Sequence, residues 1–200
     1  MCRVTVYVLM LVIATTSCGQ SGTQPQSEWE TFPTTVGSTW VYEWTDHLRS
    51  ETDTVLVTVT GTRDVPPWGS AKVLVTQHKS WSDTMYVVST ADTVRFIPGR
   101  YLGFGRATFV LPLQVGARWS IGFVDSSWVA QGGPVSVPAG VFHEAFLVEQ
   151  RYGPIFNSFL SANTWVVQGV GIVREDRREY DLGPIADYGR KLLAYNIADP

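Results

Sequence analysis

Alternating apolar and polar residues recur along most of the chain. In residues 54–60, valines occupy every second position and threonines occupy most of the positions between them. This period of two predicts a half-buried β-strand. The same alternation places Val73 and Val75 on one face of a second strand, and Trp165 and Val167 on one face of a third. The pattern therefore predicts a chain built mainly from strands.

Residues 135–142 carry the clearest hairpin signal. Two valines end a strand with their side chains on one face, and Pro138 fixes φ for the first corner of a type I turn. Gly140 can adopt the left-handed conformation that begins the return strand. Residues 141–150 are rich in β-formers and predict that return strand.

Turns follow one another closely elsewhere in the chain. Ser82-Asp83 and Ala91-Asp92 each separate two strand patterns, and Gly169-Val-Gly171 turns the chain into residues 172–180. Such short connections favour antiparallel pairing, because parallel strands need long crossovers. We predict an all-β fold, a curved antiparallel sheet or open barrel-like meander of roughly ten to twelve strands.

The C-terminal region holds the only helix candidate. Residues 186–193 contain several helix formers, but Gly189 interrupts them. Residues 191–197 predict the final strand instead, so little helix is expected anywhere.

The motif Pro-x-x-Val-Gly-x-x-Trp occurs twice, 79 residues apart. Its two copies contribute Pro33, Gly37, Trp40, Pro112, Gly116 and Trp119. We interpret the motif as a weak internal repeat in which Pro and Gly make a turn, Val docks the turn and Trp begins a strand with its ring buried. The alternative is that the tryptophans bind a ligand.

Residues 1–18 predict an export signal. Arg3 precedes an apolar run, residues 4–14, that has the length of a signal-peptide core and is too short to span a bilayer. Small residues and Cys18 follow. This segment resembles a bacterial lipobox, with Thr15 in place of the usual aliphatic residue. The resemblance implies cleavage before Cys18, which then carries a lipid.

The chain accordingly divides into a signal peptide (1–17), a flexible tether (18–31) and a single all-β domain (32–200). We expect a lipoprotein of the bacterial cell envelope, anchored to a membrane on its periplasmic or cell-surface side. Ordinary secretion is the alternative. Because Cys2 lies in the signal peptide, the mature chain holds one cysteine and cannot form an internal disulfide.

Charge excludes one class of partner. Loss of Arg3 changes the formal net charge from −3 to −4, whereas nucleic-acid binding needs a concentrated basic surface. Residues 174–179 hold three positive and three negative side chains, and we predict a solvated strand or turn there. After the signal peptide, no hydrophobic stretch is long and uncharged enough to span a membrane.

No pattern of catalytic or metal-binding residues is found. His47, His78 and His143 lie in different segments without the spacing of a zinc site, and we expect them to be isolated on the surface. A site built from His47, Asp46 and a distant partner stays open. Gly-x-Ser-x-Gly is absent. We therefore expect no enzymatic activity, catalytic residue, metal or cofactor.

The motifs together resemble a loose group of uncharacterised bacterial secreted proteins and lipoproteins. The group shares Pro-Leu-x-Val-Gly-x-x-Trp, its mid-chain repeat, Val-x-Val-Pro-Ala-Gly-x-Phe and Gly-Val-Gly-x-Val. In this chain these motifs lie at residues 33–40, 112–119, 135–142 (ending at Phe142) and 169–173, with Thr34 in place of Leu. A looser similarity to the open barrels of periplasmic lipoprotein carriers implies a concave sheet that accepts acyl chains.

Two functions fit this sequence best, and an enzyme of unrecognised type is a third alternative. In the first, the concave face of the sheet binds an apolar or lipid ligand, which would use part of the aromatic excess of eight Trp, eight Tyr and nine Phe. In the second, the concavity is filled by the protein's own side chains, and the domain is a structural or interaction module of the envelope. Neither hypothesis identifies a protein partner.

Overall fold

The computed structural model describes residues 32–99, 107–120, 125–155, 158–181 and 183–199. Every regular secondary-structure element in these residues is a β-strand, which confirms the all-β prediction. The strands in chain order are β1 (Thr39–Asp46), β2 (Glu51–Val65), β3 (Gly69–Gln77), β4 (Ser82–Ser89), β5 (Thr93–Pro98), β6 (Ala107–Val110), β7 (Arg118–Trp119), β8 (Asp125–Val137), β9 (Gly140–Ile155), β10 (Ser158–Val167), β11 (Gly171–Asp181) and β12 (Pro184–Asn196).

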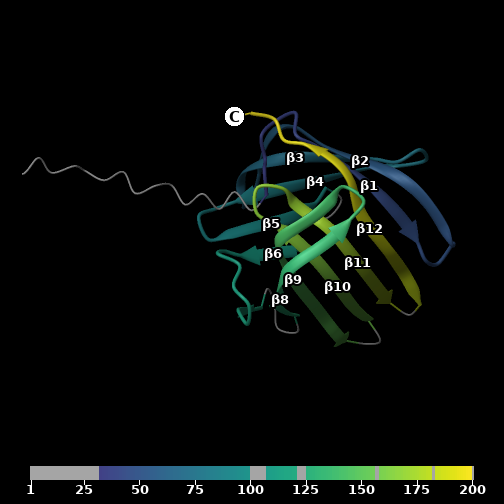
Figure 1. Cartoon of the computed structure of the whole chain (residues 1–200). Coiled ribbons are helices and arrows are strands. Elements are labelled where there is room, and N and C mark those ends of the chain that lie inside the picture. Colours follow the sequence, from purple (N-terminus) through teal and green to yellow (C-terminus); the bar gives the residue numbers. More distant parts are fainter. Residues whose placement is uncertain (1–31, 100–106, 121–124, 156–157, 182, 200) are drawn as a thin grey trace, which may run out of the picture.

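All of these strands belong to one 12-stranded antiparallel sheet. Its order, β6-β5-β4-β3-β2-β1-β12-β11-β10-β9-β8-β7, consists of two meanders joined where β1 pairs with β12. The sheet curls into a barrel-like shape (Figure 1), and its two edge strands, β6 and β7, are not paired with each other. The predicted antiparallel, barrel-like meander is confirmed.

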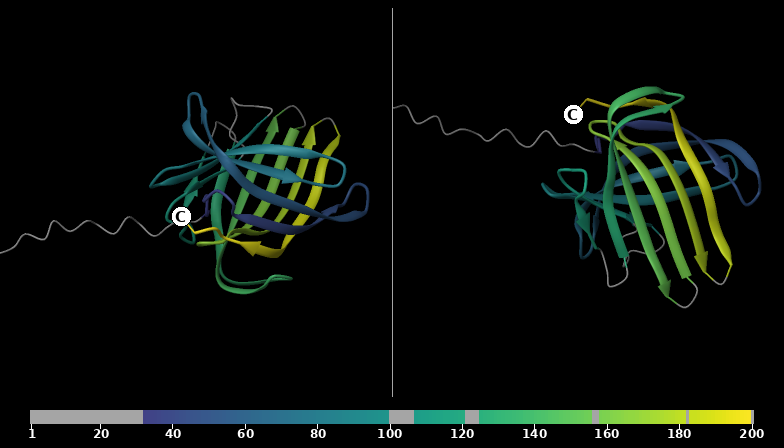
Figure 2. Two further views of the ribbon diagram at one scale, coloured as in Figure 1. Left: turned by 90° about the horizontal axis from the view of Figure 1, so that it is seen from above. Right: turned by 60° about the horizontal axis from the view of Figure 1, so that its bottom comes forward.

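The barrel has two ends, which are bordered by the turns and hairpins of the sheet (Figure 2). The closed end holds Phe32, the β8–β9 turn and the β10–β11 turn. The open end is the opposite one and is formed by the β1–β2, β3–β4 and β11–β12 hairpins. Because each strand runs antiparallel to the next, successive connections alternate between these two ends.

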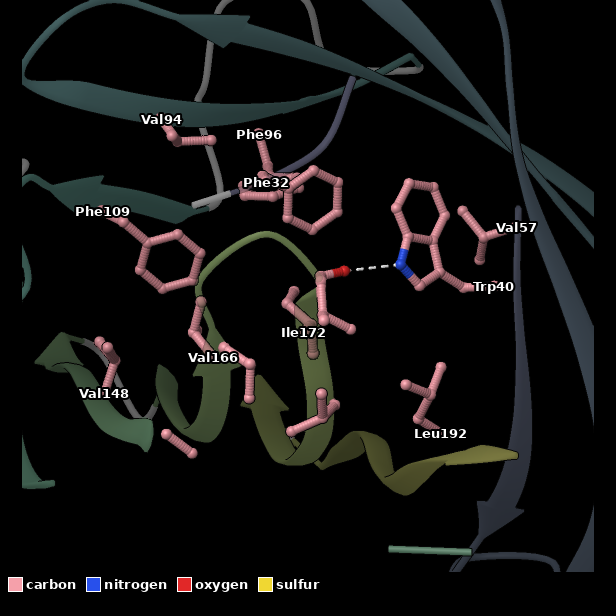
Figure 3. Packing of buried hydrophobic residues seen from close by; sticks show 14 of the residues in the cluster. Phe32, Trp40, Val57, Val94, Phe96, Phe109, Val148, Val166, Ile172 and Leu192 are labelled. Atoms are coloured by element: carbon pink, nitrogen blue, oxygen red, sulfur yellow. Dashed lines mark hydrogen bonds between the residues drawn. The ribbon is translucent and has the colours of Figure 1, made fainter. Parts of the chain in front are cut away.

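Apolar side chains fill the closed end (Figure 3). Trp40 is fully buried, and the ring of Phe32 stacks on it with 5.4 Å between the ring centroids. Phe32 also meets the edge of Phe96 at 5.0 Å. The valines that the alternation in β2 placed on one face all belong to this core: Val55, Val57 and Val59.

The Gly-Val-Gly turn between β10 and β11 is shaped by this packing. A Cβ atom on Gly171 would lie 2.8 Å from the ring of Phe32, and Gly171 has φ +93°. Gly169 also has a positive φ of +72°. The carbonyl of Val170 accepts a 2.7 Å hydrogen bond from Nε1 of Trp40, drawn in Figure 3. The motif therefore joins a turn to the core.

The predicted hairpin is present between β8 and β9. Val137 pairs with Gly140, so only Pro138 and Ala139 form the connection, and Gly140 has φ +136°. The backbone N–H of Ala139 donates to the carbonyl of Leu192 on β12 at 2.9 Å. The tip of the hairpin thus folds across the closed end of the barrel, as Figure 2 shows.

Bulges allow that bend. The β8–β9 register shifts between Val129 and Gln131 and again between Gly133 and Val135. Extra residues at bulges increase the local twist and redirect a strand. At the start of β9, Phe142 contacts Tyr195 of β12 with 6.1 Å between ring centroids.

The two motif copies form the same turn at two places. Gly37 and Gly116 have φ of +96° and +88°. Their N–H groups donate to the carbonyls of Val59 and Val129 at 2.9 and 2.8 Å. Each copy therefore attaches to the long strand that follows it, β2 or β8, by an equivalent bond.

Two features of the motif differ from the prediction. Val36 and Val115 are 49% and 60% exposed, so the valine does not dock the turn. Trp40 is fully buried, whereas Trp119 is only partly buried and its Nε1 donates to the carbonyl of Thr108 on β6 at 2.8 Å. The burial differs because Trp40 enters the middle of the sheet, whereas Trp119 lies on an edge strand of two residues.

The only helix candidate, residues 186–193, lies entirely within β12. That strand begins at Pro184, seven residues before the predicted start of the final strand. It pairs with β1 on one side and β11 on the other. Backbone hydrogen bonds on both sides outweigh the weak local preference of this segment.

Candidate functional site

A cavity of about 530 Å³ lies inside the open end of the barrel. Its floor is apolar and includes Val55, Phe96, Phe109 and Ile172, which also belong to the core of the closed end. Its wall and rim carry charged and aromatic side chains from several strands and turns, among them Trp44, Asp46, Trp81, Glu175, Arg177 and Arg190.

The polar wall arises where the inward face of a strand changes from apolar to charged. On β11, Val173 belongs to the apolar core, and Glu175 and Arg177 follow at alternate positions and line the cavity. On β12, Leu192 lies in the core and Arg190 lines the cavity. Alternate residues of a strand face the same side, so each strand continues from core to cavity wall.

This arrangement corrects the interpretation of residues 174–179 as a solvated segment. Glu175 and Arg177 are each only 7% exposed. Arg174 and Asp176, at the positions between, form a 3.0 Å ion pair with side chains 39% and 42% exposed. The run alternates between the inside and the outside of the barrel, and only its outward half is solvated.

Ion pairs hold the inward charges in place. Nε of Arg190 lies 2.8 Å from Oε2 of Glu175. Nη2 of Arg177 donates to Oε2 of Glu179 at 3.2 Å. The guanidinium of Arg190 also lies 5.0 Å from the ring centroid of Tyr42, within cation–π distance.

Both inward arginines remain charged. Burial acts to lower the pKa of Arg190, but Glu175, Tyr42 and Tyr188 outweigh it and raise that pKa above its usual range. Burial likewise opposes the charged form of Arg177, and the pKa of Arg177 is nevertheless raised, by Tyr188, Glu175 and Glu179. The wall therefore presents fixed, paired charges to the cavity.

Tyr42 gives the site a testable dependence on pH. Its hydroxyl donates to the carbonyl of Ile172 at 2.8 Å. Burial, partly offset by Arg190 and reinforced by Glu175, raises the pKa of Tyr42 from 10.0 to about 12. A raised folded-state pKa stabilises the fold fully below pH 10, and this contribution is lost as the pH rises towards 12.

Replacing Tyr42 with phenylalanine is therefore expected to flatten the alkaline part of the stability curve. Between pH 10 and pH 12, the unfolding free energy of the wild type should fall by about 2–3 kcal/mol more than that of the variant. Urea unfolding at several pH values across this window measures the difference. Parallel curves for the two proteins would contradict the assignment.

Aromatic rings form one side of the rim. Trp44 and Trp81 lie 6.0 Å apart between ring centroids, and Trp44 lies 6.1 Å from Tyr188. His78 stacks on Trp81 at 5.1 Å. Trp81 is 40% exposed, so part of its surface is available beside the cavity.

His78 is not the isolated surface residue that was expected. Its side chain is 6% exposed, and its Nε2 lies 3.2 Å from Oδ2 of Asp53. Nζ of Lys79 lies 2.6 Å from the same oxygen, and this hydrogen bond is the main cause that lowers the pKa of Asp53. His47 and His143 are exposed, as expected.

The alternative of a site built from Asp46 and His47 is not needed to explain Asp46, which has a structural role. Oδ1 of Asp46 accepts hydrogen bonds from the backbone N–H groups of Leu48 and Arg49, and Oδ2 accepts one from Arg49 Nη1. The carboxylate of Asp46 thus shapes the β1–β2 turn. Within the described ranges, no group of three or more His, Cys, Asp or Glu side chains is placed to hold a metal ion.

The motif residues lie away from the cavity. None of them is among the residues that line it: Pro33, Gly37, Trp40, Pro112, Gly116, Trp119, Pro138, Gly140, Phe142, Gly169 and Gly171. Cys18, with the signal peptide and the tether, lies outside the described residues. In the part of the chain that the structure describes, no helix is long and apolar enough to cross a membrane.

The sequence contains one signal that points to the cavity residues. Glu175 and Arg177 are in phase with Val173, and Arg190 is in phase with Leu192. An alternation that stays in phase while its inward residues change from apolar to charged is typical of a barrel with a polar interior at one end.

No family model and no curated protein matches the chain. Solved structures are similar to it, among them two crystal structures that each share 14% identity with it. A "putative lipoprotein" from Parabacteroides distasonis aligns over 83% of this chain and 98% of its own, with a TM-score of 0.46. A "putative exported protein with YmcC-like fold" from Bacteroides fragilis aligns over 82% of this chain and 98% of its own, with a TM-score of 0.49.

Proposed function

We propose that this protein binds a small amphiphile in the cavity at its open end, while a lipid on Cys18 holds the barrel at a membrane of the cell envelope. The observation that carries the proposal is the cavity of about 530 Å³, with its apolar floor and its wall of buried charges. Pockets that bind small molecules commonly range from about 300 to 1,000 Å³.

The floor suits the apolar part of such a ligand. Phe96, Phe109 and Ile172 present only carbon atoms there through their side chains. Each methylene that leaves water against such a surface contributes about 0.8 kcal/mol. A short alkyl segment would therefore supply most of the binding free energy.

The wall modifies the expectation of an apolar concavity. Glu175, Arg177 and Arg190 would lose their remaining contact with water if a hydrocarbon covered them, and uncompensated polar burial is costly. A ligand that also carries hydrogen-bonding groups keeps these side chains solvated. This favours an amphiphile over a pure hydrocarbon.

We propose binding rather than catalysis because the buried charged side chains form ion pairs with one another. Arg190 is paired with Glu175, and Arg177 with Glu179. Both arginines have raised pKa values, so neither is suited to exchange a proton near neutral pH.

Replacing Ala186 with tryptophan is expected to abolish or strongly weaken binding. Ala186 lines the cavity, so a large ring there occupies the space of the ligand. The protein for this test is residues 18–200 with Cys18→Ser, purified without detergent. It contains the whole described sheet. Isothermal titration with dodecyl maltoside below its critical micelle concentration should show a loss of at least about tenfold in affinity.

Ala194→Trp is the matched control, because Ala194 is exposed on the same strand. It should bind as the wild type does. Equal affinity in Ala186→Trp would place binding elsewhere. If the wild type neither binds dodecyl maltoside nor retains lipid in native mass spectrometry, the proposal is wrong and the structural-module hypothesis stands.

A further inference from the structure

The positive and negative side chains deep in the cavity are equal in number. Its inward arginines, Arg177 and Arg190, are matched by the carboxylates of Glu175 and Glu179. These four groups already pair with one another. A charged group of a ligand that reached them would lose its hydration without gaining a counter-ion. The charged group of a ligand is therefore better placed at the rim, where water remains.

The rim offers aromatic surface to such a group. Trp44 and Trp81 both line the cavity, and Trp81 is 40% exposed. Indole rings attract a cation placed over their faces, most strongly when it is partly desolvated. A cation–π contact of this kind occurs elsewhere in the chain, where the guanidinium of Arg95 lies 3.9 Å from the ring centroid of Trp68. No described arginine or lysine lies over Trp44 or Trp81.

Asp83 supplies a negative charge to the same cavity. Its side chain lines the cavity, and its Oδ1 accepts a hydrogen bond from the backbone N–H of Thr84 at 2.9 Å. It forms no ion pair with another described residue. By contrast, Asp46, Asp53 and Asp187 nearby are each paired with a cationic side chain.

We propose that Trp44, Trp81 and Asp83 receive the positively charged ammonium group of an amphiphile whose apolar tail occupies the floor of the cavity. This inference rests on the proposed function and specifies its ligand class. Zwitterionic and purely cationic amphiphiles share the ammonium group, and a free fatty acid or an alkyl sulfate lacks it. The charge-balanced wall then contacts the uncharged part of the ligand.

Four probes with the same dodecyl tail test the headgroup by isothermal titration, each below its critical micelle concentration. They are dodecyltrimethylammonium, dodecylphosphocholine, dodecyl maltoside and dodecyl sulfate. Both ammonium probes should bind at least about tenfold more tightly than dodecyl sulfate. Tighter binding of dodecyltrimethylammonium would indicate a cationic ligand, and tighter binding of dodecylphosphocholine a zwitterionic one. Either result supports the ammonium site.

Two rim variants locate the effect. Trp81→Leu and Asp83→Asn should each lower the preference for dodecyltrimethylammonium over dodecyl maltoside by roughly three- to tenfold. Tyr195→Leu is the control, because Tyr195 is 43% exposed at the closed end, and it should leave this ratio unchanged.

Dodecyl sulfate binding as tightly as the ammonium probes, or a ratio unaffected by both rim variants, would overturn the ammonium site while leaving amphiphile binding intact. Failure of all four probes to bind would overturn the proposed function as well.

Discussion

Replacing Trp40 with alanine is expected to destabilise the protein by about 3–5 kcal/mol, the range for removing a large buried aromatic side chain. The ring is fully buried and stacks on Phe32. The substitution also leaves the carbonyl of Val170 without the hydrogen bond from Nε1, in an interior where replacement water is scarce. The closed end of the barrel is held together at this point, so the loss should affect global stability.

Trp119→Ala is the informative comparison, because the second motif copy forms an equivalent turn. Trp119 is only partly buried on a two-residue edge strand, so its loss should cost less, roughly 1–2 kcal/mol. Denaturation by urea, followed by circular dichroism, measures both. An equal cost at the two positions would show that the seam between β6 and β7 is as tightly packed as the core.

The second large effect is expected at Glu175. Changing it to glutamine preserves its size but removes the negative charge beside Arg190. Breaking a buried ion pair by removing one partner commonly costs 3–5 kcal/mol. Because the side chain of Arg190 is 21% exposed and the residue lines the cavity, we expect about 3 kcal/mol, near the lower end of that range.

Asp176→Asn provides a matched control on the neighbouring residue of the same strand. Its carboxylate pairs with Arg174 on the outer face, where both side chains are well exposed. Exposed pairs contribute at most about 1 kcal/mol. A double variant, Glu175→Gln with Arg190→Met, should recover part of the stability that Glu175→Gln loses. If Glu175→Gln and Asp176→Asn lower the free energy of unfolding by the same amount, the pair of Glu175 with Arg190 contributes no more than an exposed pair.

Local patterns were sufficient to predict the strands and most of the turns. The valines of β2 face the core as their alternation indicated, and Pro138 and Ala139 form a two-residue hairpin connection before Gly140. Glycines at 37 and 116 adopt positive φ in equivalent turns. These features depend on residues within a few positions of one another, so a single sequence contains the information that specifies them.

The pairing that joins the two meanders has no such local signal. β1 pairs with β12 from Thr39 opposite Asn196 to Asp46 opposite Tyr188. Partners this far apart in the chain meet only because the two meanders curl towards each other. Residues 186–193 form part of β12 because of this pairing, although their composition alone made them the one helix candidate.

The candidate site depended on this pairing and on the curl of the sheet. Residues 174–179 carry charges on both faces of β11, so alternation alone could not distinguish a solvated strand from a cavity wall. Once the sheet curls, Glu175 and Arg177 face the interior beside Arg190, and Arg174 and Asp176 face solvent. The sequence by itself determined an antiparallel all-β meander, because strand period and turn chemistry are local. Only the tertiary structure decided which charges are buried and where the cavity opens, because the inside of a barrel is defined by strands that are distant in the chain.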